Sequence, residues 1–143
     1  MFQTAIPFLD LAISITDFNH ENFLVLKGIC YMNSGKEKQA EKIFLKILKK
    51  DKKNEAIKFN LASLYFGQGN LEKSKQYLTD NITSNKSSAK RHFMLGQIYV
   101  REGKYDKAIN EITYAIEKTN FLPEKESMRK ELERAKKLIL PSQ

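Results

Sequence analysis

Few side chains in this sequence are of the types that most often carry chemistry. Cys30 is the only cysteine among 143 residues, and the two histidines, His20 and His92, lie far apart in the chain. No cluster of Cys and His has the spacing of a metal site. A single cysteine excludes an internal disulfide, and its place just before Tyr31 in an expected helix favours a packed thiol over a reactive one. The sequence therefore predicts neither a metal centre nor a nucleophilic thiol.

Two glycine-containing segments share part of the pattern of phosphate-binding loops. Residues 67–72, Gly-Gln-Gly-Asn-Leu-Glu, begin like a dinucleotide-binding loop but end in Glu and follow an expected helix instead of a strand. Gly35 and Lys36 lack the earlier Gly and the following Ser or Thr of a nucleotide-binding P-loop. We therefore expect no catalytic residues, no cofactor and no enzymatic activity.

The glycines belong instead to a pattern that repeats every 34 residues. Gly35, Gly69 and Gly103 hold the same place in three consecutive copies. A fixed period of this length indicates one supersecondary unit stacked on copies of itself, an architecture that usually binds other molecules. Four further sets of residues share the period: Gly28, Ala62 and Gly96; Tyr31, Tyr65 and Tyr99; Ala40, Ser74 and Ala108; and Phe44, Leu78 and Ile112.

The spacing inside each copy predicts two helices joined by a tight turn. A small residue followed three positions later by Tyr puts both on one helical face, where a second helix can approach closely. The glycine after the first helix can take the left-handed conformation that ends it, and the second helix carries apolar residues at helical spacing. No stretch alternates with period two. The expected helices cover residues 22–34, 37–50, 55–68, 71–84, 89–102 and 105–118.

The repeat pattern resembles the tetratricopeptide repeat (TPR) family. The second copy reads Leu61-Ala62-x-x-Tyr65, followed by Ser74 and Leu78, and the three copies agree in one phase. The resemblance implies an all-α, helical-hairpin solenoid with three full repeats. These repeats cover residues 21–54, 55–88 and 89–122. The usual opening Trp is replaced by Leu24, Lys58 and His92, and the closing Pro by Lys52, Lys86 and Asn120.

Residues 1–20 look like part of an earlier repeat. The segment 4–17 has the pattern of a second helix, and its own first helix is missing. We therefore expect the native chain to extend upstream, and we expect Phe8, Leu11 and Ile15 to be partly uncovered here. The alternative is that this helix is an N-terminal cap, whereas dimerisation in solution through this end would support an uncovered patch.

The other end predicts a helix that closes the array. Residues 123–143 form an apolar stripe backed by charged residues, and Arg129 stands where a further repeat would need a small side chain. This pattern is typical of a capping helix and tail. We therefore expect one domain over residues 1–143, made of the partial repeat, three repeats and the cap.

The second repeat is expected to be weakest where its second helix ends. Asn81 occupies a place held by Ile47 and Ala115 in the neighbouring copies, and Thr79 and Thr83 are poor helix formers. An amide at an apolar position costs stability unless it finds a hydrogen-bond partner. We therefore expect this exit to be the least stable part of the array.

The formal charge of +8 raises nucleic acid or anionic lipid as the alternative ligand. Of the 25 cations only four are Arg, the residue best suited to phosphate recognition. The densest Lys run, within 46–53, lies at the end of a second helix and in the turn that follows, and the helix dipole favours cations at a helix C-terminus. A solvated face is therefore preferred to an anion site. No apolar run is long enough to span a membrane, and the first twenty residues lack a basic leader, so the compartment stays open.

The TPR resemblance implies a non-enzymatic module that binds a protein or peptide along a concave groove lined by the first helices. Phe59, Phe66 and Phe93 would form an aromatic track, while Lys90 and Arg101 would suit an acidic residue in an apolar ligand. A chaperone C-terminal tail is not expected, because Val25 stands where a carboxylate-binding Lys is needed. The expected binding residues are Val25, Ile29, Met32, Phe59, Asn60, Phe66, Lys90, Phe93, Gln97 and Arg101. Helix packing alone, or a groove filled by another segment of a longer scaffold or assembly protein, are the alternatives.

Overall fold

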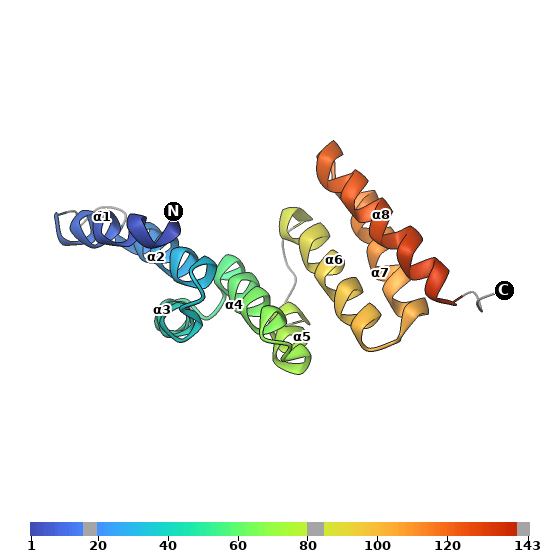
Figure 1. Ribbon diagram of the computed structural model, residues 1–143, viewed down its shortest axis with the longest axis horizontal. Helices are drawn as coiled ribbons and strands as arrows, with labels where there is room; N and C mark the ends of the chain where they lie inside the picture. Colours follow the sequence, from blue (N-terminus) through green and yellow to red (C-terminus); the bar gives the residue numbers. More distant parts are fainter. Residues whose placement is uncertain (16–19, 80–84, 140–143) are drawn as a thin grey trace. The chain divides into compact units, whose positions relative to one another are not determined.

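The computed structural model describes residues 1–15, 20–79 and 85–139, and these residues form helices and no strand (Figure 1). The chain divides into two compact units, Met1–Asn70 and Leu71–Gln143. The all-α prediction is confirmed. The helices are α1 (Phe2–Ile15), α2 (His20–Asn33), α3 (Glu37–Lys50), α4 (Glu55–Gly67), α5 (Leu71–Thr79), α6 (Asn85–Arg101), α7 (Tyr105–Lys118) and α8 (Leu122–Ile139).

Most helix bounds agree closely with those predicted from the repeat. Helices α3 and α7 have the predicted bounds, whereas α6 begins at Asn85 instead of residue 89. The earlier start of α6 is physically reasonable because residues 85–88 include neither Pro nor Gly. The prediction for Asn81 lies outside the described residues. The prediction of a single domain stays a prediction.

In the first unit, successive helices pack side by side. Helix α1 contacts α2, α2 contacts α3, and α4 contacts both α3 and α2. Phe44 and Leu61 have no exposed surface and anchor this core. Helix α4 begins with a side-chain cap, because the Ile57 backbone N–H donates to Asn54 Oδ1 at 3.1 Å. The contact of α4 with α2 places the first helix of the second repeat next to the first helix of the first repeat.

The small residues at the eighth place of the repeat allow the paired helices to touch. A Cβ atom added to Gly28 would lie 2.5 Å from Phe44 Cε1, and one added to Gly96 would lie 2.5 Å from Ile112 Cγ1. Both distances are well below van der Waals contact, so neither site has room for a methyl group. The predicted close approach of first and second helices is confirmed within each unit.

The three turns inside the repeats are built alike. Gly35, Gly69 and Gly103 have φ values of 72°, 75° and 72°. In the first turn, the Lys36 backbone N–H donates to the Tyr31 carbonyl at 2.8 Å, and the other two turns repeat this bond at 2.9 and 2.8 Å. This arrangement is the Schellman motif, in which a glycine in left-handed conformation ends the helix. The predicted role of the three glycines is confirmed.

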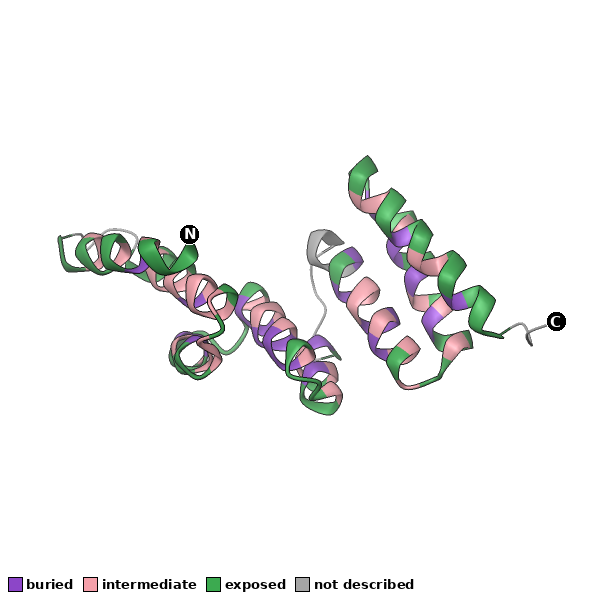
Figure 2. Cartoon of the chain, viewed as in Figure 1, coloured by how far each residue is buried: buried purple, intermediate pink, exposed green. Residues whose placement is uncertain are grey.

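In the second unit, α5 packs on α6, α6 on α7, and α7 on α8. Ile112 and Ala115 of α7 form a core cluster with Met128 of α8. The opposite side of α8 is exposed, as Figure 2 shows by its green stretches. Charged residues cover this outer side, in agreement with the expected capping helix.

We predict that Gly28→Ala lowers the free energy of unfolding by about 1–2 kcal/mol. Overpacking a tight core costs about 1–3 kcal/mol, and the Phe44 ring cannot move aside freely because it is fully buried. The gain of helix propensity from Gly to Ala, at most about 1 kcal/mol, offsets part of this loss. Urea unfolding followed by circular dichroism measures the difference.

Gly67→Ala is the matched control in the same unit. Gly67 also lies in a helix, but nothing lies within 4 Å of a Cβ added there. The same substitution should therefore leave stability unchanged or raise it by a few tenths of a kcal/mol. Equal effects of the two substitutions would contradict the close approach of α2 and α3.

Candidate partner-binding surface

In the first unit, the expected binding residues lie on two neighbouring helices. Val25, Ile29 and Met32 share one face of α2, and each is partly exposed. Phe59 and Phe66 lie two turns apart on α4, and both are also partly exposed, as is Asn60. Because α2 and α4 contact each other, these side chains belong to adjoining helices. The unit therefore offers solvent-accessible apolar side chains from two first helices.

The rest of α4 fixes the orientation of this face. Leu61 and Leu64 point into the core. The Tyr65 hydroxyl donates to Glu41 Oε1 at 2.5 Å, and Gln68 Nε2 donates to Glu37 Oε2 at 2.8 Å, so both bonds tie α4 to α3. A helix held on one side by core packing and polar bonds presents a defined opposite side.

In the second unit, the expected binding residues of α6 are not equally available. Lys90 and Arg101 are exposed, and Gln97 is partly exposed. Phe93, however, packs against the core cluster of Ile112, Ala115 and Met128. Phe93 therefore has a packing role, and only part of its ring reaches solvent.

A carboxylate lies near each of the two expected cations of α6, Lys90 and Arg101. Lys90 Nζ lies 3.3 Å from Glu124 Oε1 of α8, so an acidic ligand group would have to compete with this carboxylate. Next to Arg101, the carboxylate of Glu102 binds Lys104 and Lys75, each at 2.6 Å. These two ammonium groups, Lys104 most of all, hold the pKa of Glu102 below its usual range.

The same network acts on the lysine of α5. Hydrogen bonds to Glu102 first and to Glu72 second raise the pKa of Lys75 to about 12. Lys75 therefore stays charged at physiological pH and joins α5 to the end of α6. The repeat period gave no sign of this network, because its partners occupy different places in their copies.

Of the residues considered for chemistry, His92 and Cys30 are partly buried, whereas His20 is exposed at the start of α2. His92 Nδ1 lies 2.5 Å from Glu111 Oε2, and the His92 ring lies 4.2 Å from the Tyr114 ring centre. Cys30 is half-buried. Within the described parts of the chain, no three His, Cys, Asp or Glu side chains are grouped so that they could hold a metal ion. No helix in the same parts is long and apolar enough to cross a membrane.

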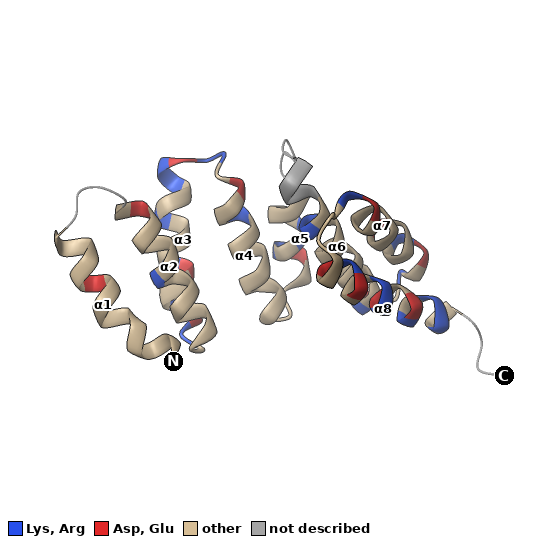
Figure 3. Cartoon of the chain, turned by 90° about the horizontal axis from the view of Figure 1, so that it is seen from above, with Lys and Arg blue, Asp and Glu red and all other residues tan. Residues whose placement is uncertain are grey.

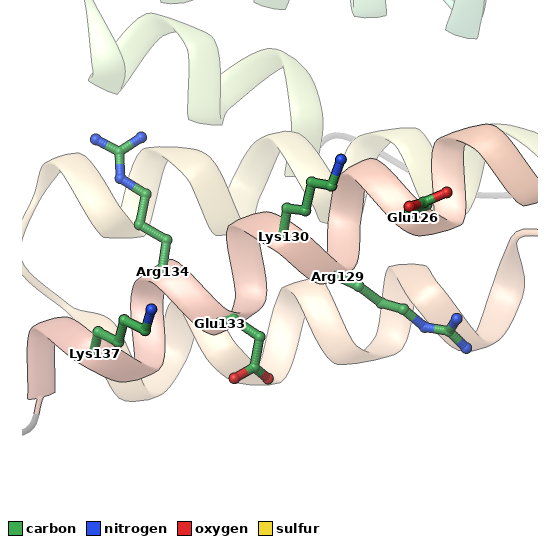
Figure 4. Close-up of a pocket in the computed structure, with 6 residues that line it drawn as sticks. All are labelled: Glu126, Arg129, Lys130, Glu133, Arg134 and Lys137. Carbon is green, nitrogen blue, oxygen red and sulfur yellow. The ribbon is translucent and has the colours of Figure 1, made fainter.

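The cations relevant to the alternative ligand are widely solvated. Figure 3 shows the lysines at the end of α3 and in the turn that follows it, and these side chains are exposed. On α8 a hollow of about 430 Å³ lies among charges of both signs (Figure 4). Its lining residues are Glu126, Arg129, Lys130, Glu133, Arg134 and Lys137. Carboxylates interspersed with the cations make this face a poor site for a polyanion.

Arg91, one of the four arginines of the chain, is buried and therefore not available to a phosphate ligand. Its side chain has no exposed surface, and Nη1 donates to the Leu78 carbonyl at 3.3 Å. Leu78 lies in the last turn of α5, where helix carbonyls lack partners within the helix. Arg91 therefore closes a helix end inside the second unit.

Comparisons with known proteins agree with the repeat architecture. A family model described as "SusR N-terminal TPR domain" matches residues 2–129. A solved structure titled "MamA RS-1 ArsTM double mutant" is similar with a TM-score of 0.74 and 19% identity, covering 94% of this chain and 73% of that one. A second, "Crystal structure of MamA", has a TM-score of 0.68 and 21% identity, covering 96% and 88%. No curated protein sequence matches the chain closely enough to count as a relative.

Proposed function

The chain belongs to the family of SusR N-terminal TPR domains, and on this premise we propose that it is a non-enzymatic module binding an apolar peptide or helix within a larger scaffold or assembly protein. Helical repeat arrays of this kind use extended faces, built from equivalent helices, to bind protein partners. The proposed binding faces are those of the first helices α2, α4 and α6.

The observation that carries the proposal is the accessible apolar face of the first unit. Val25, Ile29 and Met32 on α2, with Phe59 and Phe66 on α4, remain partly exposed although many nearby apolar side chains are buried. Aromatic and methionine side chains of this kind are enriched at the centres of protein interfaces. An extended or helical peptide along these two helices would cover them.

The polar residues of the proposed faces define the partner further. Asn60 and Gln97 can donate and accept hydrogen bonds, and Lys90 and Arg101 carry positive charge. The proposed faces contain no acidic residue. The partner is therefore an apolar segment, and an acidic side chain in it would suit α6 if it displaced Glu124 from Lys90.

The salt dependence of binding distinguishes this function from binding of nucleic acid or anionic lipid. A partner recovered by pull-down from the native cell is titrated against the chain at rising salt. We predict that affinity changes by less than about threefold between 50 and 300 mM salt, because apolar contacts dominate. A phosphate-driven complex would instead lose on the order of a hundredfold or more over a similar range. Such a loss, or recovery of nucleic acid alone, would contradict the proposal.

A further inference from the structure

We propose that the exposed face of α1 is a dimerisation surface that pairs with α1 of a second copy of this chain. This inference is independent of the proposed partner-binding faces on α2, α4 and α6. It starts from three large apolar side chains on α1. Phe8 is 76% exposed, Leu11 59% and Ile15 72%.

The three side chains form a continuous stripe. Their spacing of three and then four residues places them on one side of the helix, as in the seam of a coiled coil. Met1, fully exposed one heptad before Phe8, extends this stripe. A stripe of this regularity matches the side of a second helix better than it matches an irregular surface.

The opposite side of α1 is already occupied. Helix α1 contacts α2, and Ile6 is buried. Asp10, the only charged residue of α1, forms an ion pair with Lys27 of α2. The side of α1 that bears the stripe therefore carries no charged side chain, although Asp10 itself is 51% exposed on the other side.

The absence of charge favours a second copy as the occupant. A chain with a net charge of +8 repels its own copies, and an uncharged face lets two copies meet without placing like charges together. An acidic or basic partner would find no charged side chain to pair with on this face. The stripe therefore fits a neutral apolar helix, and α1 itself is such a helix.

The polar groups beside the stripe do not oppose its burial. The Thr4 hydroxyl donates to the Met1 carbonyl at 2.7 Å, and the Ser14 hydroxyl donates to the Leu11 carbonyl at 2.7 Å. Both hydroxyls keep these bonds when water is removed, so burial leaves no unpaired donor.

The available area is sufficient for a specific dimer of modest strength. A fully accessible large side chain has roughly 200 Å² of surface, so the exposed parts of Met1, Phe8, Leu11 and Ile15 together offer about 650 Å² per copy. Two copies together therefore offer about 1,300 Å², above the ~1,000 Å² that a specific interface needs. We expect a dissociation constant on the order of tens of micromolar.

We expect the two α1 helices to pair in an antiparallel arrangement with twofold symmetry. In such a dimer a residue near the axis meets its own copy. With Met1 included, Phe8 lies at the middle of the stripe, so Met1 of one copy would lie against Ile15 of the other. Gln3 would lie far from its own copy.

Sedimentation equilibrium of the 143-residue chain, from low to several hundred micromolar, tests the proposal. We expect a monomer–dimer equilibrium that weakens at least about tenfold in Leu11→Asp, since a charge would then be buried without a partner. Leu45→Asp is the matched control, because Leu45 is 40% exposed on α3 and should leave the equilibrium unchanged. A monomeric wild-type chain, or a dimer that Leu11→Asp does not weaken, would overturn the proposal and leave the stripe to a preceding helix or another protein.

Cross-linking decides the matter if Leu11→Asp fails to fold. In a Cys30→Ala background, Phe8→Cys should form an intermolecular disulfide much faster than Gln3→Cys on the same helix. Equal cross-linking rates at the two positions would also overturn the proposal.

Discussion

Replacing Arg91 by Ala is expected to lower the free energy of unfolding by about 3 kcal/mol. The Arg91 side chain is fully buried and donates from Nη1 to the Leu78 carbonyl. Truncation removes this bond at the end of α5 and leaves a cavity beside α6. Losses of this size are expected where a large buried side chain and its hydrogen bond disappear together. Urea unfolding, with the midpoint and the slope both recorded, gives the value.

Two further variants separate burial from charge. Arg91→Met retains much of the volume without the buried charge, so its loss should be smaller than that of Arg91→Ala. Arg129→Ala removes an exposed arginine from α8 and should change stability by less than about 0.5 kcal/mol. If Arg91→Ala were as harmless as Arg129→Ala, the buried position of Arg91 would be wrong.

Phe59→Ala is expected to weaken partner binding by about 2 kcal/mol, or roughly 30-fold. Interface energy concentrates in a few aromatic anchors. Phe59 is partly exposed on α4, which is the first helix of the second repeat and contacts α2. Phe93 is a less suitable probe, because it also packs on the core cluster of α7 and α8. Isothermal titration with the recovered partner measures the change, and circular dichroism establishes that the variant is folded.

Leu45→Ala is the control for a non-specific loss of apolar surface. Leu45 is exposed on α3, a second helix outside the proposed face, so its truncation should leave affinity unchanged. If Phe59→Ala unfolds, Met32→Ala on α2 replaces it as the probe. A folded Phe59→Ala or Met32→Ala variant with full affinity would place the binding surface elsewhere.

The features that follow from repeat periodicity were predictable from the sequence. A small residue that must touch a second helix recurs as Gly28 and Gly96, and a residue that must take positive φ recurs as Gly35, Gly69 and Gly103. Both requirements are steric, and few residue types meet them. Their recurrence in one phase therefore makes the helices, the turns and the fold predictable from the sequence.

Features that depend on a single copy were harder to predict. Arg91 occupies the repeat position that Phe23 and Ile57 hold in the other copies. The apolar residues at this position were the signal in the sequence that the Arg91 side chain would be buried. The bonds of Lys75 with Glu102 join two helices at unrelated repeat places, so no periodic signal marks them. The packing of Phe93 on α7 and α8 likewise depends on the three-dimensional arrangement.

The most direct test of the central claim is chemical-shift mapping by NMR of the chain with its recovered partner. We predict that the largest perturbations fall on Val25, Ile29 and Met32 of α2 and on Phe59 and Phe66 of α4. The lysines at the end of α3 and the outer face of α8 should change little. Perturbations confined to those charged surfaces, with α2 and α4 unaffected, would contradict the proposed mode of binding.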